Sequence, residues 1–246
     1  HMSGLIQQVS SADEIFCISD SVAQDLKRFF DLPPECVHVT LLGNNVDDGF
    51  ANEFLEMTKD TLLENYLVVL GTIEPRKNIP LILEWLRRYR EILKEYRVLF
   101  IGKNGWGPTF QQLAEKHLLD HELHSGQILH LDYVEEHEKA ALLTGASALL
   151  FPSFFEGFGL PVLEAMTVNV PVICSCSTSL PEVLGPRGYY FNPESVDSLH
   201  AAFQDFKVDS NNGRLSVIKK EAHERASSFS YDTMFQSILD TISIKI

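Results

Sequence analysis

The sequence has few cysteines, no excess of positive charge and no long apolar run. Its four cysteines, Cys17, Cys36, Cys174 and Cys176, form neither a CxxC pair nor a dense framework, which favours a reduced, cytosolic setting. Lysine and arginine number 20 against 34 aspartates and glutamates, and the formal net charge is −14. Because a nucleic-acid backbone would be repelled by this charge, the composition argues against a general nucleic-acid-binding protein.

Membrane-spanning and secretory signals are also lacking. No apolar run reaches the roughly 18 to 20 residues needed to cross a bilayer, and we expect no signal peptide. With 246 residues, 45% hydrophobic and 22% charged, the chain can bury a sizeable core in one large or two smaller domains. We expect a cytoplasmic protein, with peripheral contact at the inner face of a membrane left open.

From Tyr66 onward, short apolar runs alternate with amphipathic segments, which is typical of an α/β fold with a doubly wound parallel sheet. We predict strands over residues 66–70, 98–101, 128–131, 148–151, 172–174 and 189–191. Helices are predicted over 79–96, 109–119, 135–143, 161–168, 180–184 and 196–206, followed by two terminal helices over 213–228 and 231–242. Such a Rossmann-like sheet binds ligands at the carboxyl ends of its strands.

The opening segment has a different organisation. A strand is predicted over residues 15–18, a helix capped by Ser19 or Asp20 and running to 30, and a second strand over 37–42. The following stretch, 43–49, has loop composition. Two strands and one helix cannot close a sheet, so we expect this segment to be the last piece of a domain whose beginning lies outside the sequence.

The stretch from 154 to 166 combines a turn, a helix start and two acids. Backbone amides near Phe158, Gly159 and Leu160 are predicted to point outward at the positive end of a helix dipole, which makes an anion site. Glu156 and Glu164, with seven residues between them, flank it. Phosphate-binding amides between two hydroxyl-binding carboxylates suit a nucleotide-sugar. The alternative is a plain connector, because glycine turns before helices are common in α/β proteins.

This stretch resembles the E-x7-E signature of retaining glycosyltransferases of family 4, which have the GT-B architecture, and the resemblance covers roughly residues 14 to 242. It implies that Glu156 meets the hydroxyls of the donor sugar. The amides of Phe158, Gly159 and Leu160 would meet the phosphates, and Glu164 would hold the ribose.

A basic pair follows the first strand of the main sheet. Gly71 opens a segment in which Arg76 and Lys77 lie near a helix start, where two cations can neutralise a diphosphate. A solvated basic pair is the alternative. The segment resembles the Gly-Arg-x-x-x-x-Lys segment of the family, whose cations stabilise the leaving nucleoside diphosphate. Thr72 stands at the usual arginine position and Arg76 beside the lysine, a variant that we associate with mannosyltransferase-like members.

Residues after the third strand indicate which base the nucleotide carries. A carboxylate there can accept hydrogen bonds from the N1 and N2 donors of guanine, although glutamates at a helix start also serve as dipole partners. In relatives that use a guanine donor, Val134, Glu136 and Lys139 match base-reading positions. GDP is therefore favoured over UDP. The glycine-rich turn 102–107 lacks the dinucleotide-binding spacing and is expected at most to line the site.

We expect no metal and no cofactor. His117 and His121 stand four apart on a predicted helix with His124 beyond, but no carboxylate or cysteine completes a site and the resembling family works without a metal. Surface histidines are the favoured interpretation. Glu182, where the family often has a glutamate, is interpreted as structural.

These observations predict the donor-binding half of a GT-B hexosyltransferase. Residues 1–58 would be a remnant of the N-terminal acceptor domain with its linker, 59–229 the nucleotide-sugar-binding domain, and 230–246 a helix that crosses back to the N-terminal domain. The donor would be a nucleotide-sugar, plausible as GDP-mannose, and the acceptor a saccharide or lipid-linked saccharide. Alone, the chain would bind nucleotide and transfer little. A non-catalytic binding module and a GT-B sugar-nucleotide epimerase stay open as alternatives.

Overall fold

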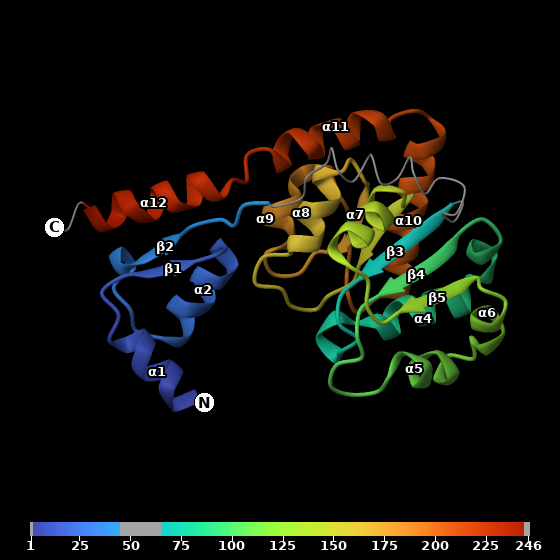
Figure 1. Cartoon of the computed structure of the whole chain (residues 1–246), viewed down its shortest axis with the longest axis horizontal. Coiled ribbons are helices and arrows are strands. Elements are labelled where there is room, and N and C mark those ends of the chain that lie inside the picture. Colours follow the sequence, from blue (N-terminus) through green and yellow to red (C-terminus); the bar gives the residue numbers. More distant parts are fainter. Residues whose placement is uncertain (1, 45–64, 244–246) are drawn as a thin grey trace.

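The structure, a computed structural model, describes residues 2–44 and 65–243, and its main feature is a parallel sheet of six strands (Figure 1). The strand order is β5-β4-β3-β6-β7-β8. The strands are β3 (Tyr66–Leu70), β4 (Arg97–Ile101), β5 (Ile128–Leu131), β6 (Ala148–Phe151), β7 (Val172–Ser175) and β8 (Tyr189–Phe191). All six predicted strands are confirmed, and only β4 and β7 differ from prediction, by one residue each.

The chain adds strands outward from the middle of the sheet in two directions. From β3 it proceeds to β4 and β5 on one side, then returns to place β6 directly beside β3 before adding β7 and β8. The order therefore reverses between β3 and β6. In an open parallel sheet, the carboxyl ends of the two strands at such a reversal border a crevice for ligands.

Side chains of the central strands alternate between two cores, because successive residues of a strand point to opposite faces. Leu67 and Val69 lie in one core, and Val68 and Leu70 in the other. The first face is covered by α4 (Ile79–Arg88), α5 (Phe110–Lys116) and α10 (Val196–Asn211). The second is covered by α7 (Glu136–Thr144), α8 (Leu160–Thr167), α9 (Leu180–Leu184) and α11 (Leu215–Ala226).

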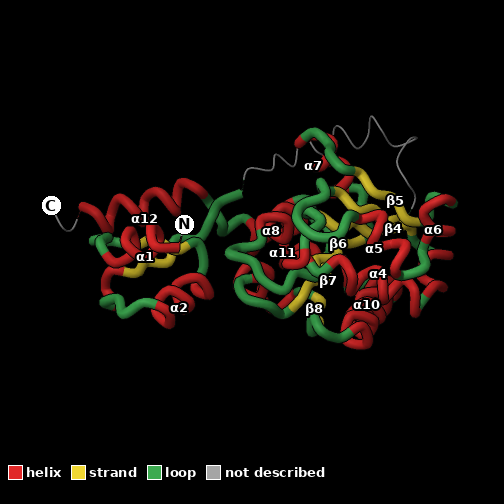
Figure 2. The backbone as a smooth tube through the Cα atoms, turned by 90° about the horizontal axis from the view of Figure 1, so that it is seen from below, coloured by secondary structure: helices red, strands yellow, loops and turns green. Residues whose placement is uncertain are grey.

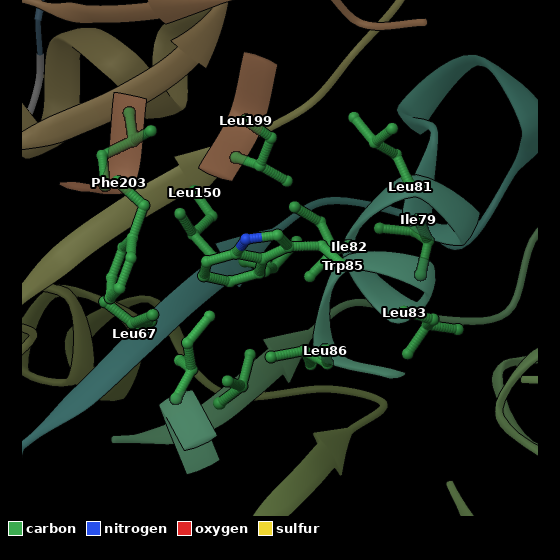
Figure 3. Packing of buried hydrophobic residues seen from close by; sticks show 14 of the residues in the cluster. Leu67, Ile79, Leu81, Ile82, Leu83, Trp85, Leu86, Leu150, Leu199 and Phe203 are labelled. Carbon is green, nitrogen blue, oxygen red and sulfur yellow. The ribbon is translucent and has the colours of Figure 1, made fainter. Parts of the chain in front are cut away.

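Trp85 occupies the middle of the first core. Its ring is fully buried and meets Phe203 edge-on, with the ring centroids 4.9 Å apart. Figure 3 shows the indole of Trp85 enclosed by Leu150, Leu199 and Ile82. This packing joins α4 and α10 to the sheet and so sets the position of the turn that precedes α4.

Several helices differ from prediction where the local backbone changes direction. The predicted helix 79–96 ends at Arg88 and continues as a separate 3-10 helix, Arg90–Lys94. The predicted helix 109–119 is α5, which Thr109 caps, and it ends because Leu118 has a left-handed φ of 58°. A further helix, α6 (Asp120–His124), and α1 (Met2–Ser10) were not predicted. Helix α10 extends five residues beyond its predicted end, to Asn211.

The N-terminal segment forms a small parallel pair, β1 (Ile15–Cys17) and β2 (Val37–Val39), connected by α2 (Asp20–Phe29) and the 3-10 helix Pro34–Cys36. Both strands are shorter than predicted. Ser19 caps α2 as predicted, since its side chain accepts a hydrogen bond from the amide of Val22. Most of the predicted loop 43–49 and the end of the connector near 58 lie outside the described residues.

Helix α12 (Tyr231–Ser243) leaves the main sheet and lies beside β2 (Figure 1), and Figure 2 shows it next to the small pair of strands of the N-terminal segment. A cavity of about 200 Å³ between the two is lined by Val39, Leu41 and Met234 among others. None of the helices in residues 2–44 and 65–243 has the length and apolar character that a membrane span requires. The predicted domain boundaries stay predictions.

Candidate functional site

The loops that follow β3 and β6 meet at the point where the strand order reverses. The amide of Phe154, in the loop after β6, donates to the carbonyl of Arg76, in the loop after β3, at 2.9 Å. In the same region the side chain of Asn78 donates to the carbonyls of Pro152 and Pro193. Adjacent strands and these hydrogen bonds bring together residues that lie about 80 positions apart.

Lys77 ends the 3-10 helix Pro75–Lys77 and is buried, with 9% of the residue exposed. Its ammonium nitrogen donates to Glu156 Oε1 at 2.7 Å and lies 4.9 Å from the centre of the Phe151 ring. Gly71 makes room for it: Gly71 has a φ of 134°, and a Cβ there would lie 3.3 Å from the ammonium nitrogen. The two predicted residues Gly71 and Lys77 therefore form one packed unit.

Glu156 lies between the two predicted cations. Its Oε2 accepts from Arg76 Nη1 at 2.8 Å, so each carboxylate oxygen has one cationic partner. Arg76 also pairs with Glu74 at 2.8 Å and donates to the carbonyl of Phe155. Because each carboxylate oxygen can accept about two hydrogen bonds, Glu156 keeps capacity for a hydroxyl donor.

The two cations, Arg76 and Lys77, differ in their exposure to solvent. The side chain of Arg76 is 40% exposed and that of Lys77 only 11%. Two cations and the two acids Glu74 and Glu156 balance in formal charge. Because Arg76 is the more exposed of the two cations, an anion arriving from solvent would contact Arg76 directly, whereas Lys77 would act on it mainly through its charge.

The start of α8 carries the predicted anion-binding amides. Gly159 takes a left-handed φ of 105°, and Pro161 stands in the first turn. None of the backbone N–H groups of Phe158, Gly159 and Leu160 donates a hydrogen bond to another described residue. Unpaired amides at a helix N-terminus are suited to binding an anion.

The three phenylalanines of this turn have different environments. The Phe158 ring is buried in the core, where it meets Phe229 edge-on with centroids 5.8 Å apart. Phe154 and Phe155 are about half exposed, and Phe154 lines a neighbouring cavity of about 390 Å³. Of Phe158, only the backbone amide is therefore positioned to contact a ligand.

The second acid of the E-x7-E pair joins the predicted base-reading residues. Lys139 on α7 donates to Glu164 Oε1 at 3.1 Å and pairs with Glu136 Oε1 at 2.6 Å. Glu164 Oε2 is buried and has no hydrogen-bond partner among the described residues. Val134, in the loop before α7, is partly buried against the second core. An unpartnered buried carboxylate oxygen is unfavourable, and a ligand hydroxyl would satisfy it.

The pKa of Lys139 reflects this pairing. Burial acts to lower it, but the hydrogen bond to Glu136 and the charge and hydrogen bond of Glu164 outweigh burial, and the pKa lies above its ordinary value. The Lys139 ammonium group is therefore firmly charged and gives Glu164 Oε1 a cationic hydrogen-bond partner.

The histidines do not lie on one helix, which corrects the prediction. His117 follows α5, and His121 and His124 belong to α6, beyond the turn at Leu118. His117 Nδ1 lies 3.3 Å from Glu84 Oε2, and His124 Nδ1 lies 2.6 Å from the carbonyl of Asp120. In residues 2–44 and 65–243, no three potential ligand side chains gather to hold a metal ion.

Glu182 and Ser19, which the sequence analysis interpreted as a structural residue and a helix cap, connect the opening segment to the main sheet. Glu182 accepts hydrogen bonds from the amides of Asp20 and Ser21 at the start of α2, at 2.8 and 2.7 Å. Ser19 donates to the carbonyl of Gly157 at 2.7 Å. The opening segment is thus attached directly to the turn. Spacing alone gave no signal for these contacts, because the partners are more than 130 residues apart.

Comparisons with known proteins bear on this arrangement. The model of the family "Glycosyl transferases group 1" matches residues 56–225. The chain belongs to this family. The match includes every predicted site residue, from Gly71 to Glu164.

Several curated relatives of this chain are named mannosyltransferases, and two of them serve as examples. The chain is 34% identical over 203 residues to O-antigen chain mannosyltransferase B of Escherichia coli, a match that covers 80% of this chain and 52% of that protein. It is 30% identical over 194 residues to the MMP alpha-(1->4)-mannosyltransferase of Mycolicibacterium hassiacum, covering 76% and 44%. The chain thus spans about half the length of these relatives.

Among solved structures, sucrose-phosphate synthase of Thermosynechococcus elongatus superimposes with a TM-score of 0.77 at 19% identity, covering 99% of this chain and 61% of that one. This likeness concerns the fold. Together with the six-stranded parallel sheet, it confirms the predicted Rossmann-like half of a GT-B architecture.

Proposed function

We propose that this chain is the donor-binding half of a retaining hexosyltransferase. In the whole enzyme, a hexose would move from a nucleotide-sugar to a hydroxyl of a saccharide or lipid-linked saccharide. The observation that carries the proposal is the start of α8, where unpaired amides of Phe158, Gly159 and Leu160 lie between the Glu156 cluster and Glu164. The names of the mannosyltransferase relatives support mannose as the hexose.

The diphosphate would lie at the amides of α8, within reach of Arg76. As the bond from the sugar to the diphosphate breaks, negative charge grows on the phosphate oxygens while the sugar gains positive, oxocarbenium character. Arg76, Lys77 and the amides favour that growing charge, and interactions that strengthen in the transition state accelerate the reaction. Protein groups alone would stabilise the charge on the leaving diphosphate, without a metal ion.

The two acids would bind the two sugars of the donor. Glu164 Oε2, which is buried without a partner among the described residues, would accept a hydrogen bond from a ribose hydroxyl, while Oε1 accepts from Lys139. Glu156 would accept from hydroxyls of the transferred hexose with the lone pairs that the two cations leave open. No general base is assigned, since the departing phosphate would take the proton of the acceptor hydroxyl.

The base is proposed to be guanine. Glu136 has a side chain that is 81% exposed at the start of α7, so a ligand can reach it. Its carboxylate would accept from the N1 and N2 donors of guanine, a pair that uracil does not offer. Val134 would contribute its backbone and Lys139 its ammonium group. The acceptor groups, and any peripheral contact with the cytoplasmic face of a membrane, are assigned to parts of the enzyme outside this chain.

Calorimetric titration of the chain with GDP, UDP and ADP tests the proposal. We expect GDP to bind most tightly, and Glu164→Ala to weaken binding by about tenfold because a ribose contact is lost. Failure of all three nucleotides to bind at millimolar concentration would contradict the donor site. Product analysis with a nucleotide-sugar and the whole protein separates the alternatives: an epimerase changes the sugar while it remains on the nucleotide, and a binding module leaves it unchanged.

A further inference from the structure

Thr178 has an unusual backbone conformation close to the site. It lies between β7 and α9 with a φ of 46°, in the left-handed region. A β-branched residue rarely adopts this conformation, because its branched side chain crowds the backbone. Residues held in such conformations persist when surrounding contacts over-determine them, and they cluster at functional sites.

The side-chain hydrogen bonds of Thr178 within the described part of the chain are all made to the backbone of one residue, Glu156. Its Oγ1 accepts from the amide of Glu156 at 3.0 Å and donates to the carbonyl of Glu156 at 3.0 Å. Both backbone polar groups of Glu156 are thereby bound to a single hydroxyl. The next residue, Ser179, is fully buried and contacts the carbonyls of Glu156 and Phe158 through its own hydroxyl, at 3.0 and 2.9 Å.

This double contact restricts how the Glu156 side chain can point. The Glu156 carboxylate lies between Arg76 and Lys77, which come from a different loop, so its orientation needs a backbone that does not rotate. Gly157 and Gly159 lie on both sides of Phe158, and glycine restricts the backbone of the turn less than other residues do. Hydroxyl groups of neighbouring segments hold this turn through its backbone, and that of Thr178 binds both the N–H and the C=O of Glu156.

We propose that Thr178 is a positioning residue, whose hydroxyl orients Glu156 toward the hexose of the donor. The inference rests on the proposed function, because it takes Glu156 to be the group that meets this sugar. Thr178 itself would not contact the donor. Preorganising a binding group in this way matters because a displacement of about 1 Å can cost orders of magnitude in a site.

A matched pair of variants isolates the hydroxyl. Thr178→Ser and Thr178→Ala both remove the γ-methyl group and the β-branch, and they differ in one oxygen atom. We expect Thr178→Ser to bind GDP-mannose within about twofold of the unaltered chain, and Thr178→Ala to bind it about tenfold more weakly, since Glu156 loses a backbone hydrogen-bond partner. GDP lacks the hexose, so its affinity should change by less than about twofold in both variants.

A double-mutant cycle separates positioning from a general structural role. In a Glu156→Gln background, Thr178→Ala should weaken GDP-mannose binding no further, because the group that it orients is already altered. Equal loss of GDP and GDP-mannose affinity, or equal affinities of the Ser and Ala variants, would overturn the inference. If Thr178→Ala does not fold, Thr178→Gly replaces it, because glycine adopts the left-handed conformation freely and also lacks the oxygen.

The same titrations separate this inference from the proposed function. If the unaltered chain binds neither GDP nor GDP-mannose, the proposed function fails and the role of Thr178 fails with it. If the unaltered chain binds both and the Ser and Ala variants are indistinguishable, only the role of Thr178 fails.

Discussion

At the scale of single residues, the site depends on a carboxylate that two cations share. Glu156 is 8% exposed and has one hydrogen-bonded cation on each oxygen. Removing one partner from a buried ion pair is costly, because the remaining charge lacks compensation, whereas removing both charges is often tolerated. If the proposed donor site is right, the same atoms of this cluster serve both stability and ligand binding.

Lys77→Met tests this link, since methionine keeps the length of the side chain and loses the charge. We predict that the free energy of unfolding falls by about 3 kcal/mol because Glu156 is left with Arg76 alone. GDP affinity should fall by at least about tenfold because a charge facing the diphosphate is lost. Urea unfolding and calorimetry measure the two effects.

The double variant Lys77→Met/Glu156→Gln is the control for this prediction. It removes both charges, so most of the lost stability should return while the GDP affinity stays low. A double variant whose destabilisation equals the sum of the two single variants would show that the pair does not act as a unit, and would contradict this account of the cluster.

At the scale of elements, the turn from β6 into α8 depends on backbone geometry at one glycine. Gly159 has a φ of 105°, and a Cβ there would lie 2.6 Å from Leu180 Cδ2 on α9. The sequence predicted this turn and the helix behind it, because glycine and Pro161 are strong local signals. It did not predict that α9 closes the space beside Gly159, since that contact is between distant residues.

Gly159→Ala should therefore destabilise the protein through both strain and crowding. We predict a loss of about 2 kcal/mol or more in the free energy of unfolding, measured by urea titration. Gly157→Ala is the matched control two residues away: its Cβ would lie 3.4 Å from Ile18 Cδ1, an ordinary contact, and its φ is not in the left-handed region. Equal stabilities of the two variants would contradict this interpretation of the turn.

Helix α2 offers a second test at this scale. Two of its first amides donate to Glu182, which α9 carries, while Ser19 bonds to the turn at Gly157. A carboxylate that accepts hydrogen bonds from the first amides of a helix stabilises that helix. Glu182→Ala should therefore lower the free energy of unfolding by about 1 kcal/mol. The amides of α2 should exchange with deuterium faster, while those of α8 keep their rates.

Glu224→Ala is the control for Glu182→Ala. Glu224 lies on α11, its side chain is 62% exposed, and its one ion-pair partner among the described residues is Lys220, at 3.6 Å. Its removal should leave exchange in α2 unchanged. Unaltered exchange of α2 in Glu182→Ala would rule out Glu182 as the group that secures this helix.

At the scale of the whole molecule, the sheet was predictable because buried parallel strands are continuous apolar runs. The run Tyr66–Leu70 is buried at every position, and its observed bounds are the predicted ones. Helix ends were less predictable, because a left-handed residue such as Leu118 leaves no local signal. The lengths of the opening strands were overestimated. In the second of them only residues 37–39 pair, but Leu41 and Leu42 continue the apolar pattern.

The site was predictable in part because the strands that position it were predictable. Gly71, Lys77, Glu156 and Glu164 were predicted because strand ends bring their loops to one edge of the sheet. The pairing of Lys139 with Glu164 and the hydroxyl of Thr178 beneath Glu156 were not predicted. These contacts depend on how two helices and two loops pack together, which the spacing of residues along the sequence does not reveal.

The central claim is that unpaired amides at the start of α8 bind the diphosphate of a nucleotide. Amide NMR of the chain, titrated in parallel with GDP and with guanosine, tests it most directly. We predict that GDP shifts the amide resonances of Phe158, Gly159 and Leu160 strongly, and that guanosine leaves them nearly unchanged because it lacks the phosphates. Binding of GDP that leaves these three resonances in place would contradict the claim.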